Sequence, residues 1–276
     1  NDLHAFNRFT SACSAIVLRV PGFQPTANQM TALICEPVHN LVARAELELS
    51  GAAFTATHIP DASGFDFFAS VDPWSRPVRV INAPDGSVWV VDMVRRVIEH
   101  PEWIPTAWQE RIDLRSGSQL GRIYRVFDSG YEPRSPGHID SAAQILSALA
   151  SENGALRDLG LQALIEAEPE SIAELQPDVR ELARGSSRAD VRASALGCLL
   201  AKQWLTTDDV IHTLAADDSR LVRFGLELSE NFADQLTPEL QAALSGVVAR
   251  DVGPAIDLQW ILTASLMENL PSSAEL

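Results

Sequence analysis

The stretch Pro77-Val-Arg-Val-Ile81, Ala83-Pro-Asp-Gly86 and Ser87-Val-Trp-Val-Val-Asp-Met93 decides the fold of the first half of the chain. Two β-branched runs flank a four-residue segment that ends in Asp-Gly. This is a strong hairpin signal, because these residues tolerate the positive φ of tight turns. The stretch therefore predicts two antiparallel strands joined by a short turn.

Other strand-like runs lie on both sides of this hairpin. The run Gly121-Arg-Ile-Tyr-Arg-Val-Phe127 follows it, and a set of four precedes it. Repeated sets of short antiparallel strands are typical of the blades of a β-propeller, so residues 1–127 are predicted to form about two C-terminal blades. One half of a plain β-sandwich is the alternative. The preceding runs are Ala15–Arg19, Met30–Cys35, Leu41–Leu47 and Ala53–Ile59.

The second half changes to helical periodicity. Four segments of apolar and small residues share a frame, and aligning Arg157, Arg192, Arg223 and Asp257 gives spacings of 35, 31 and 34 residues. Paired helices at this period predict an α-solenoid of HEAT-like repeats over residues 139–276, with an irregular helical bundle as the alternative. The partner helices are expected at Ser141–Ala150, Glu170–Ala183, Asp208–Ala215 and Pro238–Ala249, with Leu156, Leu159, Val191, Leu196, Val222 and Leu226 inside.

The two halves also differ in charge. The 276 residues carry a formal net charge of −16, with 13 acidic and 11 basic residues in 1–127 but 24 and 10 in 128–276. Together with the Pro- and Gly-bearing stretch from Asp128 to Gly137, this asymmetry predicts two domains with a linker at residues 128–138. The acidic composition argues against a nucleic-acid partner, and no apolar run is long enough to cross a membrane.

Three stretches of the first half go beyond a generic strand pattern. They are Thr10-Ser-Ala-Cys13, Cys35-Glu-Pro-Val-His-Asn-Leu41, and a long run from Ser70 through Trp89-Val-Val-Asp-Met-Val94 to Arg125. Over residues 10–127 they resemble the secreted, planctomycete-type membrane-bound dehydrogenase family, in which HEAT-like repeats follow a β-propeller.

The resemblance implies a periplasmic or secreted quinoprotein-like enzyme. The family is named by likeness to glucose and sorbosone dehydrogenases. These enzymes are propellers that oxidise a sugar hydroxyl or aldehyde with pyrroloquinoline quinone (PQQ). The resemblance therefore implies PQQ and Ca²⁺ as cofactors of the full-length protein. Many members continue into a c-type cytochrome, which is the expected electron acceptor.

This chain departs from the family pattern in three ways. It has no Cys-x-x-Cys-His for haem, it holds about two blades where closure takes four to eight, and Val94 stands where the family has Tyr. The chain by itself is therefore expected to be inactive and to hold no cofactor. The missing blades or another protein chain are expected to cover its sheet edge.

Blade topology predicts which residues meet. In a meandering blade the turn Glu36–Asn40, the loop Asp72–Arg76 and the excursion Val94–Leu120 should lie at one rim, where propellers place ligands. By resemblance to the sugar dehydrogenases, Arg76 is predicted to bind a cofactor carboxylate through its planar fork of donors. A structural pairing of Arg76 with Asp72 or Asp92 is the alternative.

The other rim residues are weaker candidates for functional roles. His39 is predicted as the catalytic base, with a structural histidine as the alternative. Trp74 is predicted to stack on a flat cofactor or else to pack in its loop, and Glu36 and Asp72 are weaker candidates for Ca²⁺ ligands. The residues predicted to contact the cofactor are Arg76, Asn40, Trp74 and Arg95.

The cysteines give a covalent prediction. Cys13 starts the first strand and Cys35 ends the second, so antiparallel neighbours would place them opposite each other, close enough for a disulfide. A Cys13–Cys35 disulfide would agree with an oxidising compartment, and two reduced thiols are the alternative. Cys198 lies among leucines of a predicted helix and is expected to be a buried hydrophobe.

Two functions of different classes follow. The first is the C-terminal portion of a secreted quinoprotein-like sugar or aldehyde dehydrogenase, whose rim contributes to a cofactor or substrate site and whose repeats contact proteins. The second is a non-catalytic interaction scaffold built from a degenerate propeller and an acidic α-solenoid.

Overall fold

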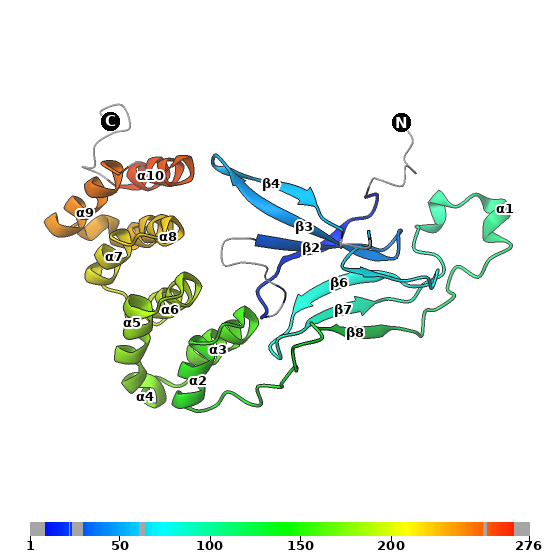
Figure 1. Ribbon diagram of the computed structural model, residues 1–276, viewed down its shortest axis with the longest axis horizontal. Helices are drawn as coiled ribbons and strands as arrows, with labels where there is room; N and C mark the ends of the chain where they lie inside the picture. Colours follow the sequence, from blue (N-terminus) through cyan, green and yellow to red (C-terminus); the bar gives the residue numbers. More distant parts are fainter. Residues whose placement is uncertain (1–8, 22, 24–29, 61–63, 251–252, 268–276) are drawn as a thin grey trace. The chain divides into compact units, whose positions relative to one another are not determined.

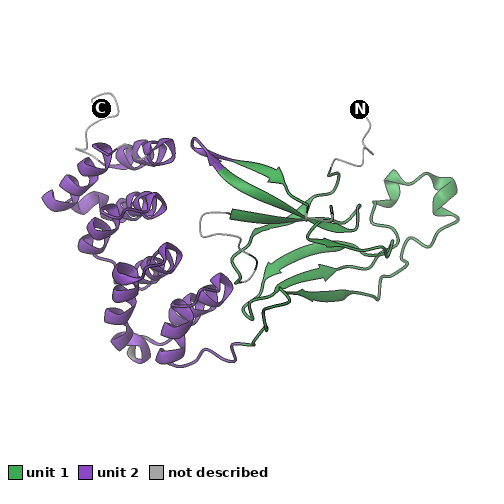
Figure 2. Cartoon of the chain, viewed as in Figure 1, with its two compact units in different colours: residues 1–48, 55–135 green, residues 49–54, 136–276 purple. Residues whose placement is uncertain are grey.

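The computed structural model describes residues 9–21, 23, 30–60, 64–250 and 253–267 (Figure 1). The chain divides into two compact units, residues 1–48 and 55–135 (the β unit) and residues 49–54 and 136–276 (the helical unit) (Figure 2). Strands in the first part are followed by helices in the second, which confirms the predicted order of β and then α.

The first sheet of the β unit has five strands. Its order is β1-β2-β3-β4, and the short β5 pairs with β3. In the antiparallel register of β1 and β2, Cys13 lies opposite Cys35, as the sequence predicts. The bounds are β1 (Cys13–Val17), β2 (Met30–Glu36), β3 (Leu41–Ser50), β4 (Ala53–His58) and β5 (Phe68–Ala69).

The second sheet contains the hairpin predicted from the Asp85-Gly86 turn. Its order is β6 (Pro77–Asn82), β7 (Val88–Asp92) and β8 (Arg122–Val126), all antiparallel. Gly86 closes the β6–β7 turn with φ +85°, and a Cβ there would overlap the ring of Tyr131.

The segment after β8 returns to this turn. The Tyr131 hydroxyl and the Arg134 backbone N–H both donate to the Asp85 carbonyl at 3.2 Å. Residues 131–134 are therefore attached to the β unit by hydrogen bonds.

The two sheets share one core. Leu18, Leu33, Cys35 and Val42 of the first sheet region pack with valines of the second, which are Val80, Val88 and Val90. Polar side chains also join the sheets, because Ser14 Oγ accepts from the Val80 N–H at 3.0 Å and Asn82 Nδ2 donates to the Val17 carbonyl at 2.8 Å.

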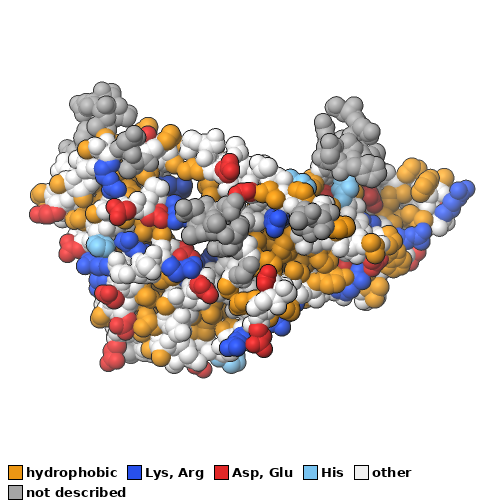
Figure 3. All heavy atoms as spheres, in the orientation of Figure 1, with side chains coloured by type: hydrophobic (Ala, Val, Ile, Leu, Met, Phe, Trp, Pro, Cys, Tyr) orange, Lys and Arg blue, Asp and Glu red, His pale blue; other side chains and the backbone are white. Residues whose placement is uncertain are grey.

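A long excursion leads from β7 to β8. It contains η1 (Pro101–Trp103) and α1 (Thr106–Gln109), and the Gln109 amide donates to the carbonyls of Pro101 and Ile104, both at 2.7 Å. Hydrophobic side chains gather on the surface of this lobe, where Trp103 is 78% exposed (Figure 3).

The helical unit has no strand among its described residues from 136 onward. Successive helices contact each other as pairs, α2 with α3, α5 with α6 and α7 with α8, and α3, α6, α8 and α10 contact in turn. The bounds are α2 (Ala142–Leu149), α3 (Gly154–Glu166), α4 (Pro169–Ile172), η2 (Ala173–Leu175), α5 (Gln176–Gly185), α6 (Ala189–Ala201), α7 (Thr207–Leu214), α8 (Ser219–Ser229), η3 (Glu230–Gln235), α9 (Pro238–Val248) and α10 (Pro254–Leu266).

Burial confirms most of the predicted helix faces and corrects one. Val191, Leu196, Val222 and Leu226 are buried as expected. In α3 the prediction is wrong for Leu159, which is exposed, and Leu156 is only half-buried, because this helix buries Gly154, Arg157, Gly160 and Leu164 instead. Gly160 allows the close approach, since a Cβ there would lie 2.9 Å from the Ala148 Cβ of α2.

Candidate functional site

The predicted rim brings several of its residues together through Arg76. One of its terminal nitrogens, Nη1, donates to the Pro37 carbonyl at 2.9 Å and to Asn40 Oδ1 at 3.3 Å. Arg76 therefore contacts the β2–β3 turn, as the blade topology predicts.

The other side of the Arg76 guanidinium faces the start of the excursion. Its Nε donates to the Arg95 carbonyl at 3.0 Å and its Nη2 to the Arg96 carbonyl at 3.2 Å. Burial lowers the pKa of Arg76, although nearby Glu99 and Asp92 oppose that shift. All three guanidinium nitrogens thus bind the protein's own carbonyl groups, and Arg76 joins two loops.

Asp92 is the buried anion beneath this rim. One of its oxygens accepts from the backbone N–H groups of Arg76 at 2.7 Å and Val94 at 2.9 Å. The other accepts from Ser75 Oγ at 3.0 Å and from Arg122 at 2.9 Å. Burial opposes ionisation of Asp92, but these hydrogen bonds outweigh it and lower the pKa of its carboxyl group.

Arg122 is a rim residue that the sequence did not predict. It binds Asp72 at 2.8 Å and Asp92 at 2.9 Å, so the two aspartates considered as partners of the Arg76 side chain pair with Arg122 instead. The signal was present in the strand register, because Arg122 lies directly opposite Asp92 in the β7–β8 pair.

Trp74 and Arg95 connect the same loops through their backbones. The Arg95 N–H donates to the Trp74 carbonyl at 2.9 Å, and the Trp74 N–H donates to Asp72 Oδ1 at 2.9 Å. The Arg95 guanidinium donates to the carbonyls of Gly117 and Ser118, which lie shortly before β8. Like Arg76, Arg95 therefore binds backbone carbonyl groups.

His39 lies at the same rim beside a buried acid. Its Nδ1 is 3.4 Å from a carboxylate oxygen of Glu36, whose side chain is fully buried, while His39 is 26% exposed. The Glu36 carboxylate also accepts from the Ser11 hydroxyl at 2.8 Å and the Ser11 N–H at 3.2 Å. This arrangement holds the imidazole while part of it remains accessible to solvent.

The predicted disulfide is wrong for this structure. Cys13 and Cys35 lie opposite each other, yet all three cysteines are free thiols. A β-bulge with Ser14 at φ +46° shifts the register directly after Cys13, and the Cys13 thiol donates to the Val78 carbonyl at 3.6 Å. Burial raises the pKa of Cys35 to about 12 and also raises that of Cys13.

The rim residues do not fit the cofactor that the resemblance implies. The carboxylates of PQQ would need free guanidinium donors, whereas each nitrogen of Arg76 already donates to a protein carbonyl or amide oxygen. Asp72 is paired with Arg122 and Glu36 with Ser11, and within the described ranges no cluster of three His, Cys, Asp or Glu side chains could hold a metal ion.

Part of the chain matches a known domain family. Residues 1–130 match the model of a domain of unknown function (DUF7133), and neither a curated protein nor a solved structure matches the chain. No helix in the described part of the chain has the length and apolar character needed to span a membrane. The match covers most of the β unit and ends before residues 136–276 of the helical unit.

Proposed function

We propose that the chain is a protein-interaction module. Its β unit supplies two blades of a larger β-propeller, and its helical unit is an α-solenoid of HEAT-like repeats that contacts other proteins. The observation that carries this proposal is the outer face of the second sheet, where four of the six side chains are apolar and Trp89 and Ile123 are exposed. Propeller blades normally bury both faces against their neighbours, so such a face is expected where a further blade docks.

The strand register defines this outer face. Trp89 lies between Ile81 and Arg125, and Val91 lies between Arg79 and Ile123. Ile123 is 67% exposed and Trp89 36%, whereas the opposite face of the same strands buries Val80, Val88 and Val90. The sheet thus has a filled inner face and a second apolar face available to a partner.

The edge of the sheet supports the same proposal. β8 is the last strand in the order β6-β7-β8, so one side of its backbone has no strand neighbour in the described chain. Such an edge is a template for pairing with another strand.

A similar feature marks the last described helix. α10 buries Ile256, Trp260 and Thr263, but exposes an aliphatic stripe on another face. By contrast α8, which contacts both α6 and α10, has no exposed large hydrophobic side chain. Terminal repeats of solenoids normally present a polar outer face, so the stripe supports docking of a further helix. Its members, Leu258, Ile261, Leu262 and Leu266, are between 46% and 60% exposed.

Self-association of the chain tests the proposal at the sheet. An uncovered blade face should make the isolated chain self-associate with rising concentration, as measured by sedimentation velocity. The double variant Trp89→Lys, Ile123→Lys should shift the chain toward smaller species. Val71→Lys is the matched control, because Val71 is a fully exposed valine outside these strands.

Two results would contradict the blade proposal. One is a wild-type chain that stays monomeric and does not bind the dye 8-anilinonaphthalene-1-sulfonate. The other is self-association that the double variant and the Val71 control change equally.

The second candidate function is the enzyme that the resemblance implies. The observation in its favour is the contact of His39 with buried Glu36, since a carboxylate beside an imidazole holds the ring in one orientation for proton transfer. In this proposal His39 takes a proton from a sugar hydroxyl or aldehyde hydrate in the periplasm. A c-type cytochrome is the proposed electron acceptor, and PQQ would be held by parts of the propeller outside this rim.

An activity assay separates the two candidates. The full-length protein, with the blades proposed to hold PQQ, is mixed with PQQ, Ca²⁺, a dye acceptor and a panel of aldoses, and the interaction module is expected to reduce no dye. Dye reduction that is lost in His39→Asn and retained in the exposed-histidine control His138→Asn would establish the enzyme and reject the first proposal.

A further inference from the structure

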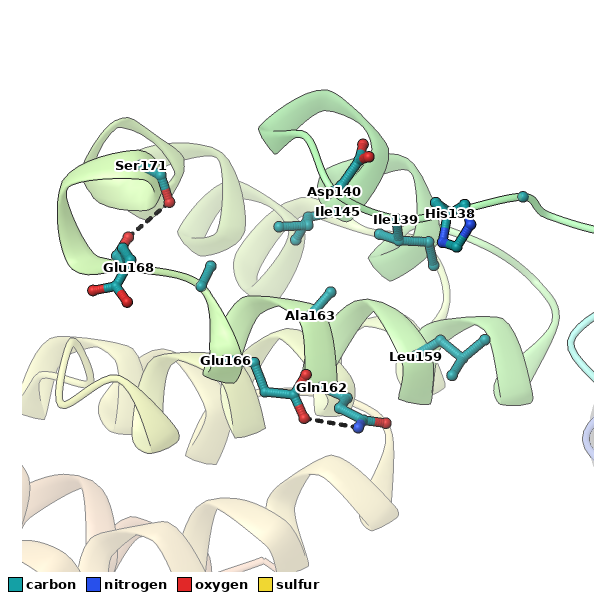
Figure 4. Close-up of a pocket in the computed structure, with 12 residues that line it drawn as sticks. His138, Ile139, Asp140, Ile145, Leu159, Gln162, Ala163, Glu166, Glu168 and Ser171 are labelled. Atoms are coloured by element: carbon teal, nitrogen blue, oxygen red, sulfur yellow. Dashed lines mark hydrogen bonds between the residues drawn. The ribbon is translucent and has the colours of Figure 1, made fainter.

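The helical unit contains a groove at its first helix pair. It lies between the segment 137–140 with α2 on one side and α3 with the start of α4 on the other, and has a volume of about 570 Å³. Its floor is aliphatic, and Figure 4 shows Ile139, Ile145 and Ala163 between the segment and α3, with Leu159 along the same side.

The margin of this groove is acidic. Asp140, Glu166 and Glu168 line it, and none of the three forms an ion pair with an Arg or Lys in the described structure. Glu166 accepts only a neutral hydrogen bond from Gln162 Nε2 at 2.8 Å (Figure 4). The ammonium of Lys202 donates to the carbonyls of Ile165 and Ala167 and makes no ion pair with these carboxylates.

Other acids of the same unit are paired with arginine. Asp190 binds Arg157 and Arg188, and Asp209 binds Arg180 and Arg184, at distances of 2.6 to 3.1 Å. Among the described residues of the helical unit, the groove carboxylates therefore lack the arginine partners that acids of neighbouring repeats have. An aliphatic floor inside an uncompensated acidic margin is complementary to an aliphatic side chain flanked by cations.

We propose that this groove binds a peptide segment of a partner protein in which one aliphatic residue is flanked on both sides by Arg or Lys. The aliphatic side chain packs against Ile139, Ile145 and Leu159, and the flanking cations face the carboxylates. The proposal rests on the protein-contact role proposed above for the helical repeats and specifies the chemistry of the partner.

Three labelled peptides test the proposal with the full chain. The first has one isoleucine between two pairs of arginines, the second replaces the isoleucine by serine, and the third replaces the arginines by glutamine. Fluorescence anisotropy should detect binding of the first peptide, with each replacement weakening it about tenfold or more. Raising the ionic strength from about 0.05 M to about 0.3 M should weaken it further.

Variants of the groove residues test whether the peptide binds in the groove. The double variant Asp140→Asn, Glu166→Gln should weaken the first peptide about threefold to tenfold, as expected for two exposed ion pairs. Leu159→Ser should also weaken it, whereas Glu239→Gln on α9 is the matched control and should leave it unchanged. Far-UV circular dichroism checks that each variant keeps its helices.

Two outcomes would overturn the inference. One is no binding of the first peptide by the wild-type chain. The other is a loss in Glu239→Gln equal to that in the groove variants, which would assign binding to the overall negative charge. Neither outcome affects the blade proposal, which depends on Trp89 and Ile123.

Discussion

The rim of the β unit and the groove of the helical unit differ in how their charged side chains are paired. At the rim, Arg76 and Arg95 bind backbone carbonyls and Arg122 binds two aspartates. At the groove, three carboxylates have no cationic partner among the described residues. Residue type alone would favour the rim as a ligand site, but the unsatisfied charge lies at the groove. A candidate binding residue must therefore be judged by the hydrogen-bond donors or charges that it still has free for a ligand.

The largest effect is expected from Asp92 beneath the rim. Asp92→Ala removes the acceptor of two backbone N–H groups and of Arg122, so the free energy of unfolding of the β unit should fall by roughly 3 kcal/mol. Urea denaturation followed by tryptophan fluorescence measures it.

The control for Asp92 is Glu110→Gln, an exposed acid of the excursion that should change stability by less than about 0.5 kcal/mol. An equally small effect of Asp92→Ala would mean that the rim is not held together by this carboxylate. The contrast with the groove would then be lost.

Arg76 should act on stability rather than on ligand binding. Arg76→Ala breaks hydrogen bonds to both loops and should lower the free energy of unfolding by about 2 kcal/mol. Arg76→Lys should not restore it, because one ammonium group cannot reach carbonyls on both sides. Unchanged denaturation together with lost retention of PQQ would return Arg76 to the ligand-binding class.

Low pH should weaken the ion pairs that the aspartates form with arginines in both units. Burial is the largest single influence on the pKa of Asp209 and acts to raise it. Hydrogen bonds from Thr206, Arg184 and Arg180 together outweigh burial, so the pKa of Asp209 is lowered. The unfolded chain then binds more protons as pH falls. The stabilisation is complete above the unfolded pKa of about 4 and is lost as pH decreases through the folded value.

We therefore expect the free energy of unfolding of the helical unit to be about 1–2 kcal/mol lower at pH 3 than at pH 5. The variant Asp209→Asn should be less stable at neutral pH and show a flatter dependence. Circular dichroism during denaturation at each pH measures both. An acid dependence as steep as that of the wild type would show that other carboxyl groups cause it.

The smallest effect is expected in the chemical labelling of the cysteine thiols. Burial raises the pKa of Cys35 and of Cys198 to about 12, so little thiolate is present near neutral pH and iodoacetamide should label neither in the native protein. The denatured, unreduced protein should take up three labels by mass measurement. A mass increase of one label that becomes three only after reduction would restore the Cys13–Cys35 bond.

Local patterns predicted much of the backbone. The Asp-Gly turn predicted the β6–β7 hairpin because glycine is required at its positive φ, and the antiparallel pairing expected of the first two strands placed Cys13 opposite Cys35. Apolar periodicity failed in α3, where the packed face contains two glycines and the buried Arg157 beside Leu164. Glycine has no side chain that would mark the buried face, so the apolar pattern predicted the wrong buried face for α3.

The sequence predicted one of the contacts within the rim but not the partners of its arginines. Meander topology correctly brought Arg76 to Asn40. The sequence does not show how many backbone carbonyls a fold leaves unpaired, and those carbonyls occupy Arg76 and Arg95. The groove was missed because its margin comes from acids on three separate segments, which only the helix packing brings together.

The attachment of Tyr131 and Arg134 to the Asp85 carbonyl has a consequence for limited proteolysis. Residues 131–134 are held against the β6–β7 turn, and Ile139 packs on the helical core, so few peptide bonds between strands and helices are open to a protease. Cleavage by a broad-specificity enzyme should begin within residues 135–138. The fragments released there would each retain all of their own hydrogen-bonded elements, which would provide a direct route to studying the strands and the helices separately.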